Sequence, residues 1–426
     1  MPIPSTHSGL HRAARLVLAI LLFAGCAGAM WLSARTGGAR LFSQYASAFG
    51  DVRTATQAVQ LAPQDPDAHT LLGMLLGRQG DAAGAVVQLE RASQLRPGDY
   101  YPWLELGMAR DAAGDAAGAE RALRESARLA PHYGQPAWQL GNVLLRLHRY
   151  DEAFRELRRA ASSDSSFFPA VIELAWGVNP NPLAVRETLQ PQTPFEHVLL
   201  ARSFAKHGAS AEAVTESRLA GETVQDHTHS LIKELIAKGA FSEAREIWIH
   251  DYKSGNPNRS ETGLPVYDGG FENILEVDDP GFGWHVATNV PTIVPSLDPN
   301  NPFAGGKSLR IDYRGLSQPG ADAISQLIVV APRTHYRLHF ATRLQEVVSG
   351  GLPVVVATDA VGPNTVLVES PALGSGTMPW RESTIDFTTS EQTKAVRVAV
   401  RRKACSSEPC PVFGSVWLDG FALEKP

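Results

Sequence analysis

A repeat with a period of 34 residues constrains this 426-residue chain more than any other feature of its sequence. A Leu-Gly pair, an alanine, a leucine and a proline recur in the same phase through three successive units. These positions are Leu72-Gly73, Leu106-Gly107 and Leu140-Gly141; Ala85, Ala119 and Ala153; Leu89, Leu123 and Leu157; and Pro63, Pro97 and Pro131. Apolar residues three and four apart predict a pair of helices in each unit. Glycine and alanine let paired helices approach closely, and proline separates one pair from the next.

The pattern resembles the tetratricopeptide repeat, and Trp103 and the run Tyr150-Asp151-Glu152-Ala153 add to the resemblance. Three units span 66–99, 100–133 and 134–167, a half-unit precedes them, and weaker units follow them. Two proline-rich segments near residues 179–182 and 191–194 break the phase and predict a shortened or distorted unit near 168–193. The resemblance covers about 44–252 and implies an all-α, right-handed solenoid.

A solenoid of this family implies a concave groove that binds a protein or peptide partner. The helix face opposite the buried Leu-Gly pair is rich in the residue types that dominate binding surfaces. The predicted groove residues are Met74, Arg78, Tyr101, Met108, Trp138, Asn142 and Arg146. The alternative is that Met108 and Trp138 simply pack between adjacent helices.

Residues 16–34 contain no charged side chain and are flanked by arginines on both sides. At a rise of about 1.5 Å per residue, such a helix nearly spans a bilayer core. We therefore expect a cytoplasmic segment at 1–15 and a membrane anchor or signal segment at 16–34. A cleaved signal peptide, with a small-residue site at Ala27-Gly28-Ala29, and a lipoprotein signal ending at Cys26 are the alternatives. All three predict a bacterial inner-membrane or exported protein whose bulk is periplasmic or extracytoplasmic.

The composition changes after residue 252. A polar stretch at 253–265 is predicted to be a linker. From 266 to 426, short alternating runs such as Ser308–Tyr313 and Val396–Val400 are separated by turn residues. This alternation predicts an all-β antiparallel sandwich of eight or nine strands.

Several short motifs in this region resemble the jelly-roll carbohydrate-binding modules of glycoside hydrolases. They are Gly269-Gly270-Phe271-Glu272, Gly305–Ile311 and Val416–Leu423. The resemblance implies that Trp284, Trp380 and Trp417 pack in the core. A glycan site would need an exposed aromatic ring. The candidates are Tyr267, Phe303 and Tyr313.

The same resemblance implies a structural calcium ion held near the first and last strands. Glu272 and Asp419 match those positions and offer hard oxygen ligands; the alternative is that they are ordinary surface carboxylates. No other cofactor is expected. Cys405 and Cys410 are predicted to form a disulfide in an oxidising compartment.

A net charge of −5 argues against a nucleic-acid partner. No metal-protease or nucleophile-elbow motif occurs in the sequence, so we expect a binding protein and not an enzyme. The hypothesis is a non-catalytic, membrane-anchored envelope scaffold in polysaccharide assembly, export or surface organisation. Its repeat would bind protein, and its sandwich would bind glycan or protein. The alternatives are a glycan hydrolase or lyase that uses the sandwich, and a purely structural protein whose sandwich has lost sugar binding.

Overall fold

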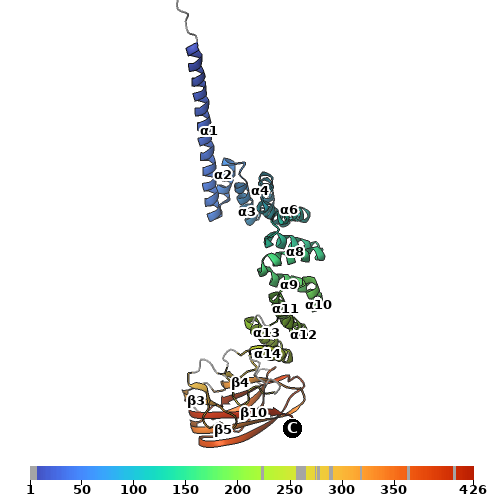
Figure 1. Ribbon diagram of the computed structural model, residues 1–426, viewed down its shortest axis with the longest axis vertical. Coiled ribbons are helices and arrows are strands. Elements are labelled where there is room, and N and C mark those ends of the chain that lie inside the picture. Colours follow the sequence, from blue (N-terminus) through green and yellow to red (C-terminus); the bar gives the residue numbers. More distant parts are fainter. Residues whose placement is uncertain are drawn as a thin grey trace, which may run out of the picture. The chain divides into compact units, whose positions relative to one another are not determined.

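A computed structural model describes residues 7–221, 225–255, 265–273, 275, 279–286, 291–316, 319–361, 365–405 and 409–426 (Figure 1). The chain forms two compact units, Met1–Asn179 and Pro180–Pro426. The boundary lies in the first of the two proline-rich segments that break the repeat. The first unit is all helical, and the second contains five helices followed by the strands. The predicted 253–265 linker lies mostly outside the described residues.

The first helix, α1 (His7–Phe49), is 43 residues long and combines two roles. Its part from Arg15 onward is long and apolar enough to cross a membrane. Its last turns pack against α2 (Val52–Leu61), where Ala39 and Ala46 are fully buried and Arg35 Nε donates to the Leu61 carbonyl at 3.0 Å. The half-unit predicted before the three regular repeats is therefore completed by the end of α1, and the helix continues well beyond the predicted limit at residue 34.

The rest of the first unit consists of helix pairs that match the predicted repeats. They are α3 (Pro66–Arg78) with α4 (Ala82–Leu95), α5 (Tyr100–Ala112) with α6 (Ala116–Leu129), α7 (Gly134–Arg146) with α8 (Tyr150–Ser163), and finally the short η1 (Ser165–Phe167) and α9 (Phe168–Val178). Aspartates cap several of these helices; Asp81 and Asp115 each accept a hydrogen bond from a first-turn amide at 2.8 Å. The tetratricopeptide-type repeat is confirmed.

The turn inside each pair requires a left-handed backbone. Gly80 and Gly114 adopt φ angles of 87° and 82°, which glycine reaches without a steric penalty. His148 lies 34 residues after Gly114 and adopts φ 58° at the same place. The third unit thus keeps the turn although it has lost the glycine.

The glycine of each repeated Leu-Gly pair marks the closest approach of two helices. A Cβ atom added at Gly73, Gly107 or Gly141 would lie 2.5, 2.5 or 2.6 Å from Cγ of the repeated leucine on the paired helix. No real Cβ atom tolerates such a distance, so the period of 34 has a steric cause.

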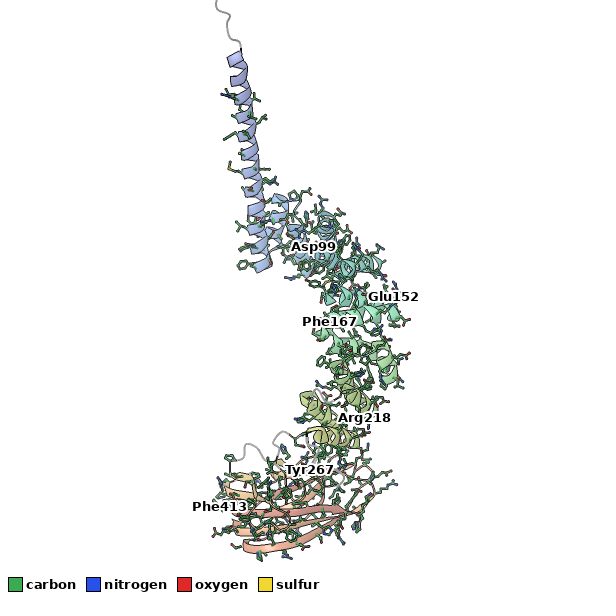
Figure 2. The ribbon with its side chains drawn as sticks, viewed as in Figure 1. Asp99, Glu152, Phe167, Arg218, Tyr267 and Phe413 are labelled. Carbon is green, nitrogen blue, oxygen red and sulfur yellow. A yellow bond between two sulfur atoms is a disulfide. The ribbon has the colours of Figure 1, made fainter. Side chains whose placement is uncertain are left out.

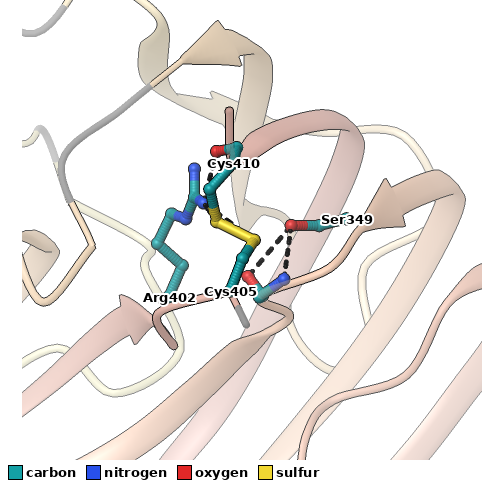
Figure 3. Close-up of a disulfide and its surroundings, with 5 residues drawn as sticks. Ser349, Arg402, Cys405 and Cys410 are labelled. Carbon is teal, nitrogen blue, oxygen red and sulfur yellow. Dashed lines mark hydrogen bonds between the residues drawn. A yellow bond between two sulfur atoms is a disulfide. The ribbon is translucent and has the colours of Figure 1, made fainter. Parts of the chain in front are cut away.

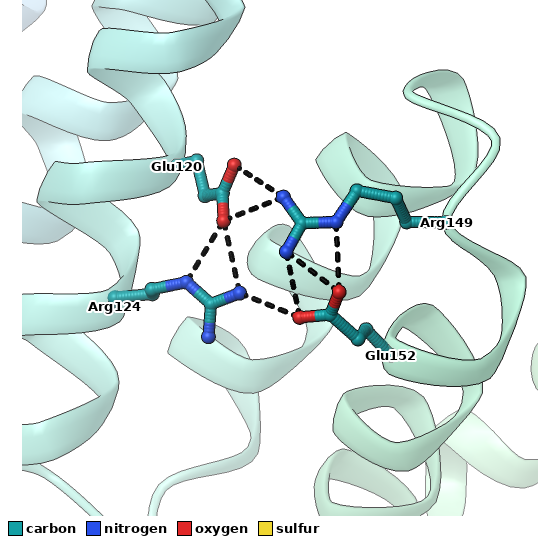
Figure 4. A network of polar contacts seen from close by, with 4 residues as sticks. All are labelled: Glu120, Arg124, Arg149 and Glu152. Carbon is teal, nitrogen blue, oxygen red and sulfur yellow. Dashed lines mark hydrogen bonds and ion pairs between the residues drawn. The ribbon is translucent and has the colours of Figure 1, made fainter.

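A closed ring of four charges joins two successive repeats on their second helices (Figure 4). Arg149 contacts Glu120 at 2.8 Å and Glu152 at 2.6 Å, and Arg124 contacts the same two carboxylates at 2.9 and 2.8 Å. Burial alone would raise the pKa of Glu120, but the hydrogen bonds from Arg124 and Arg149 outweigh it and lower that pKa. Each of the four side chains pairs with both oppositely charged members of the ring. The ring therefore links the two repeats and offers a ligand little unpaired charge.

The helices of the second unit are α10 (Pro182–Leu189), α11 (Pro194–Lys206), α12 (Ser210–Ala220), α13 (Gln225–Ala237) and α14 (Phe241–Gly255). Both phase-breaking segments start helices: Asn181 caps α10, and Thr193 forms a capping box with Glu196 on α11. α9 has 11 residues and α10 has 8, so the two helices of the predicted unit near 168–193 are short. The carboxylate of Glu216 is buried and binds Arg186 at 3.0 Å and His197 at 2.7 Å, which joins α10, α11 and α12.

The strands form two five-stranded antiparallel sheets, in the orders β1-β4-β9-β6-β7 and β2-β3-β10-β5-β8. The strands are β1 (His285–Val286), β2 (Ile293–Asp298), β3 (Ser308–Leu316), β4 (Asp322–Val329), β5 (His335–Ser349), β6 (Pro353–Asp359), β7 (Val366–Glu369), β8 (Gly376–Thr388), β9 (Ala395–Arg402) and β10 (Pro411–Glu424). Alternate residues of facing strands, such as Ile311, Phe340, Val398 and Val416, share one core. The predicted β-sandwich is confirmed.

Cys405 and Cys410 form the predicted disulfide, with their Cα atoms 5.6 Å apart (Figure 3). The guanidinium of Arg402 is buried beside it and donates to the Cys410 carbonyl and to the Cys410 sulfur. The disulfide therefore closes the β9–β10 connection over a buried charge.

Candidate functional site

The first candidate site is a hollow of about 360 Å³ between α3 and α5. Its walls are Met74 and Arg78 from α3 and Glu105 and Met108 from α5, with alanines beside them. Gly73 and Gly77 of α3 also line the hollow. Gly73 is buried against Leu89, whereas Gly77 is exposed and adds no side chain to the hollow. We call these four wall residues together with Tyr101 the α3–α5 pocket.

Polar groups surround the apolar walls of this pocket. The Tyr101 hydroxyl lies 3.4 Å from the Met74 sulfur, and the ring is 38% exposed. Burial raises the pKa of Glu105, while a hydrogen bond with Tyr101 and the charge of Arg78 partly offset this rise. The pocket thus combines two methionines, an aromatic ring and a pair of opposite charges, which suits an amphipathic segment of another protein.

The structure brings together four of the seven predicted groove residues, Met74, Arg78, Tyr101 and Met108. The other three make contacts within the repeat. Trp138 stacks on Phe167, which is labelled in Figure 2, with the ring centroids 5.0 Å apart. Asn142 Nδ2 donates a hydrogen bond to the Trp138 carbonyl at 2.8 Å. Arg146 forms an ion pair with Asp111. The alternative of packing between neighbouring elements therefore describes Trp138 but not Met108, which is 39% exposed.

Sequence reasoning missed Glu105 and Gly77. Glu105 lies three residues before Met108 and four after Tyr101, so helical spacing alone places it on the same face. Gly77 follows Gly73 by one turn, but it has no counterpart in the other two repeats, where Asp111 and Leu145 stand.

The three predicted glycan-binding aromatics have different surroundings. Tyr313 is 3% exposed and belongs to the sandwich core, so its ring offers no face to a sugar, and we remove it from the candidates. Tyr267 is half-buried and packs edge-on against Trp248 of α14 at 5.1 Å. Phe303 is 40% exposed beside Trp380, with their ring centroids 5.8 Å apart.

The second candidate site is the outward face of the sheet that contains β10. Val416 and Leu418 point into the core, so Trp417 between them points outward. One row across the strands then holds Arg310 on β3, Trp417 on β10, Arg343 on β5 and Trp380 on β8. Guanidinium-to-ring distances are 5.1 Å from Arg310 to Trp417, 4.2 Å from Arg343 to Trp417 and 5.5 Å from Arg343 to Trp380. We call these four residues the Arg–Trp row.

This row corrects the prediction that all three tryptophans pack in the core. Trp284 does, with 3% exposure and a hydrogen bond from Nε1 to the Asp268 carbonyl at 3.0 Å. Trp417 is also 3% exposed, but it is covered on the outer side of the sheet and bonds Asp298 at 2.7 Å. Trp380 is only half-buried and lies outside the core.

The two predicted calcium ligands hold a loop. The buried Asp419 carboxylate accepts hydrogen bonds from the amides of Phe303 at 3.0 Å, Ala304 at 3.1 Å and Gly420 at 2.7 Å. Burial raises the pKa of Asp419. The Glu272 carboxylate accepts a hydrogen bond from the Gly306 amide at 2.7 Å. Together these two carboxylates fasten residues 303–306 to both ends of the sandwich sequence.

Calcium needs six to eight oxygen ligands. Among the described residues, no group of three or more His, Cys, Asp or Glu side chains is placed to hold a metal ion. The Lys307 ammonium also binds the Glu272 carbonyl at 2.9 Å, where it would repel a cation. These residues fit a loop clamp better than a calcium site. A comparison of melting temperatures in calcium and in EDTA tests the calcium prediction.

No protein-family model matches the chain, and no curated protein matches it. Among solved structures, a crystal structure of MamA aligns with 42% of this chain and 91% of its own, at 16% identity and a TM-score of 0.30. A structure described as "CBM4 structure and function" aligns with 38% of this chain and 99% of its own, at 13% identity and a TM-score of 0.28. The fold assignment rests on the chain's own helices and strands.

Proposed function

We propose that this chain is a non-catalytic scaffold whose helical repeat binds a segment of a partner protein in the α3–α5 pocket. One observation carries the proposal: an apolar hollow of about 360 Å³ is bounded by two methionines and by the opposite charges of Arg78 and Glu105. Methionine-rich hollows accept apolar side chains of varied shape. Arg78 and Glu105 at its border favour a segment that also carries charge.

Two further features support an envelope setting. The N-terminal helix is long and apolar enough to span a bilayer, and the Cys405–Cys410 disulfide suits an oxidising compartment. We therefore propose a bacterial inner-membrane protein, with the repeat and the sandwich on the extracytoplasmic side. Its process would be polysaccharide assembly, export or surface organisation.

A specific observation favours a second binding function for the sandwich. The half-buried Trp380 and the 40% exposed Phe303 present aromatic surface beside the half-buried Arg343. Aromatic rings with polar groups around them are the usual means of binding sugars. We propose that this outward face binds a glycan.

Replacing Met108 by aspartate is expected to weaken capture of the repeat's partner at least about tenfold, the size of a moderate hot-spot effect. The partner is captured from detergent-solubilised membranes of the producing cell and measured by quantitative mass spectrometry. Val87 on α4 is 61% exposed and lies outside the pocket, so Val87→Asp serves as the matched control. If both variants retain the same partners as the wild type, the pocket is not the binding site.

A further inference from the structure

We propose that the Arg–Trp row binds a carboxylated sugar, a uronate, with Arg343 as the group that recognises the carboxylate. The inference rests on the proposed glycan-binding function of the sandwich and names the substrate class. The observation behind it is that the two arginines of this row differ in whether a carboxylate pairs with them.

The two arginines of the row differ in their partners. Arg310 Nε binds the Asp312 carboxylate at 2.7 Å, and Ser415 Oγ donates to the same carboxylate oxygen at 2.7 Å. Arg343 contacts no carboxylate among the described residues. Within the part of the chain that the structure describes, its guanidinium makes one hydrogen bond, from Nη1 to the Asn301 carbonyl at 3.3 Å. Since a guanidinium has five N–H donors, most donors of Arg343 remain for a ligand.

Arg343 is also held in place before any ligand arrives. Its guanidinium lies 4.2 Å from the ring centroid of Trp417 and 5.5 Å from that of Trp380. The Asn301 carbonyl accepts from both Arg343 and Trp380 Nε1, the latter at 2.9 Å. Asn301 adopts φ 54°, a left-handed conformation that asparagine tolerates better than most residues. A fixed cation loses little freedom on binding, which favours affinity.

The neighbouring groups match a sugar better than an acidic peptide. Trp380 and Phe303 form a tilted aromatic pair at 5.8 Å, and Phe303 is 40% exposed. The apolar face of a pyranose can cover such rings while a carboxylate at the edge of the sugar reaches Arg343 through charge-assisted hydrogen bonds. Gln345, the next outward position on β5 and exposed, lies opposite Ser415 and can bond sugar hydroxyls. An aspartate or glutamate side chain brings the carboxylate without the flat apolar ring.

The test is calorimetric titration of the full-length chain in detergent micelles with short oligomers of galacturonate, glucuronate and mannuronate. Each oligomer is paired with its methyl ester, which has the same sugar ring without the charge. At least one acid is expected to bind at least about tenfold more tightly than its ester, because one charge-assisted pair is lost. Arg343→Gln is expected to remove that difference.

Arg337→Gln is the matched control. Arg337 lies on the same strand and face, but it already pairs with Asp386 at 2.8 Å, so its replacement should leave the affinity for the acid unchanged. If Arg343→Gln does not fold, the comparison of acid with ester on the wild type still decides, and Arg343→Lys is expected to show an intermediate loss because it keeps the charge but not the planar fork.

Each other outcome overturns the inference in a distinguishable way. Equal binding of acid and ester would leave glycan binding standing but refute recognition of the carboxylate. Binding of polyglutamate as tight as that of the uronates would refute recognition of a sugar. Absence of binding to all the oligomers would refute both this inference and the proposed glycan function of the sandwich, while the pocket on the repeat would be unaffected.

Discussion

Replacing Asp419 by alanine is expected to lower the free energy of unfolding of the sandwich by about 3 kcal/mol. Asp419 is fully buried, and its carboxylate accepts three backbone amide hydrogen bonds at 2.7–3.1 Å. Alanine leaves these amides without an acceptor and frees residues 303–304 from β10. Hydrogen exchange of peptides from β3 and β10, followed in rising denaturant, measures the change.

The control for Asp419 is Asp386→Ala on β8. Asp386 is exposed, and its solvent-screened pair with Arg337 should contribute little to stability. Asp419→Ala with no greater effect than Asp386→Ala would show that the carboxylate does not hold the loop.

The effect of Asp419→Ala is also expected to depend on pH. Burial raises the pKa of Asp419, so the folded protein keeps the proton in a range where the unfolded chain has lost it. The stability that Asp419 contributes is therefore largest below the ordinary carboxyl pKa of about 3.9 and falls as the pH rises through the folded pKa. The difference between wild type and Asp419→Ala should shrink over that range and then stay constant.

Replacing Gly73 by alanine is expected to destabilise the first repeat by about 2 kcal/mol. The new Cβ would lie 2.5 Å from Leu89 Cγ and 3.2 Å from the Ala85 carbonyl oxygen, so α3 and α4 must separate. Gly77→Ala on the same helix is the matched control, because its Cβ would meet only Ala85 Cβ at 3.7 Å. There, the higher helix propensity of alanine should stabilise by up to about 1 kcal/mol.

The double variant Gly73→Ala with Leu89→Ala distinguishes a steric clash from a general loss of helix packing. If the clash with Leu89 is the cause, the double variant loses less stability than the sum of the single losses. Equal stability of Gly73→Ala and Gly77→Ala in hydrogen exchange of α3 and α4 would contradict the steric origin of the repeated glycine.

The helical part was largely predictable from the sequence because its contacts are local. Gly73 touches Leu89, 16 residues away, and the same contact recurs in two further repeats, so a periodic pattern records it. What the pattern did not reveal was α1, because a span and the first solenoid helix merge there into one continuous helix. The periodic pattern also did not predict the contact of Trp138, since its partner Phe167 lies in the short η1 segment and is not one of the repeated positions.

The face of the sandwich was less predictable, because its rows join strands far apart in the chain. Alternation alone does place Trp417 on the outward face, because its neighbours Val416 and Leu418 lie in the core. Tyr336 also lies in the core, and the same alternation along β5 from Tyr336 places Arg343 on the outward face. The register that sets Arg310, Trp417, Arg343 and Trp380 side by side depends on three strand pairings, two of them with bulges. A single sequence does not encode those bulges in any local signal.

Photo-crosslinking in the producing cell tests whether the α3–α5 pocket binds a partner protein. A photoreactive phenylalanine derivative is placed at position 108, in the pocket, or at position 87, which is exposed on α4. We expect a distinct crosslinked protein at position 108 that is absent at position 87 and disappears when Tyr101 is replaced by alanine. The same crosslinks at both positions, or a product at 87 alone, would contradict this expectation.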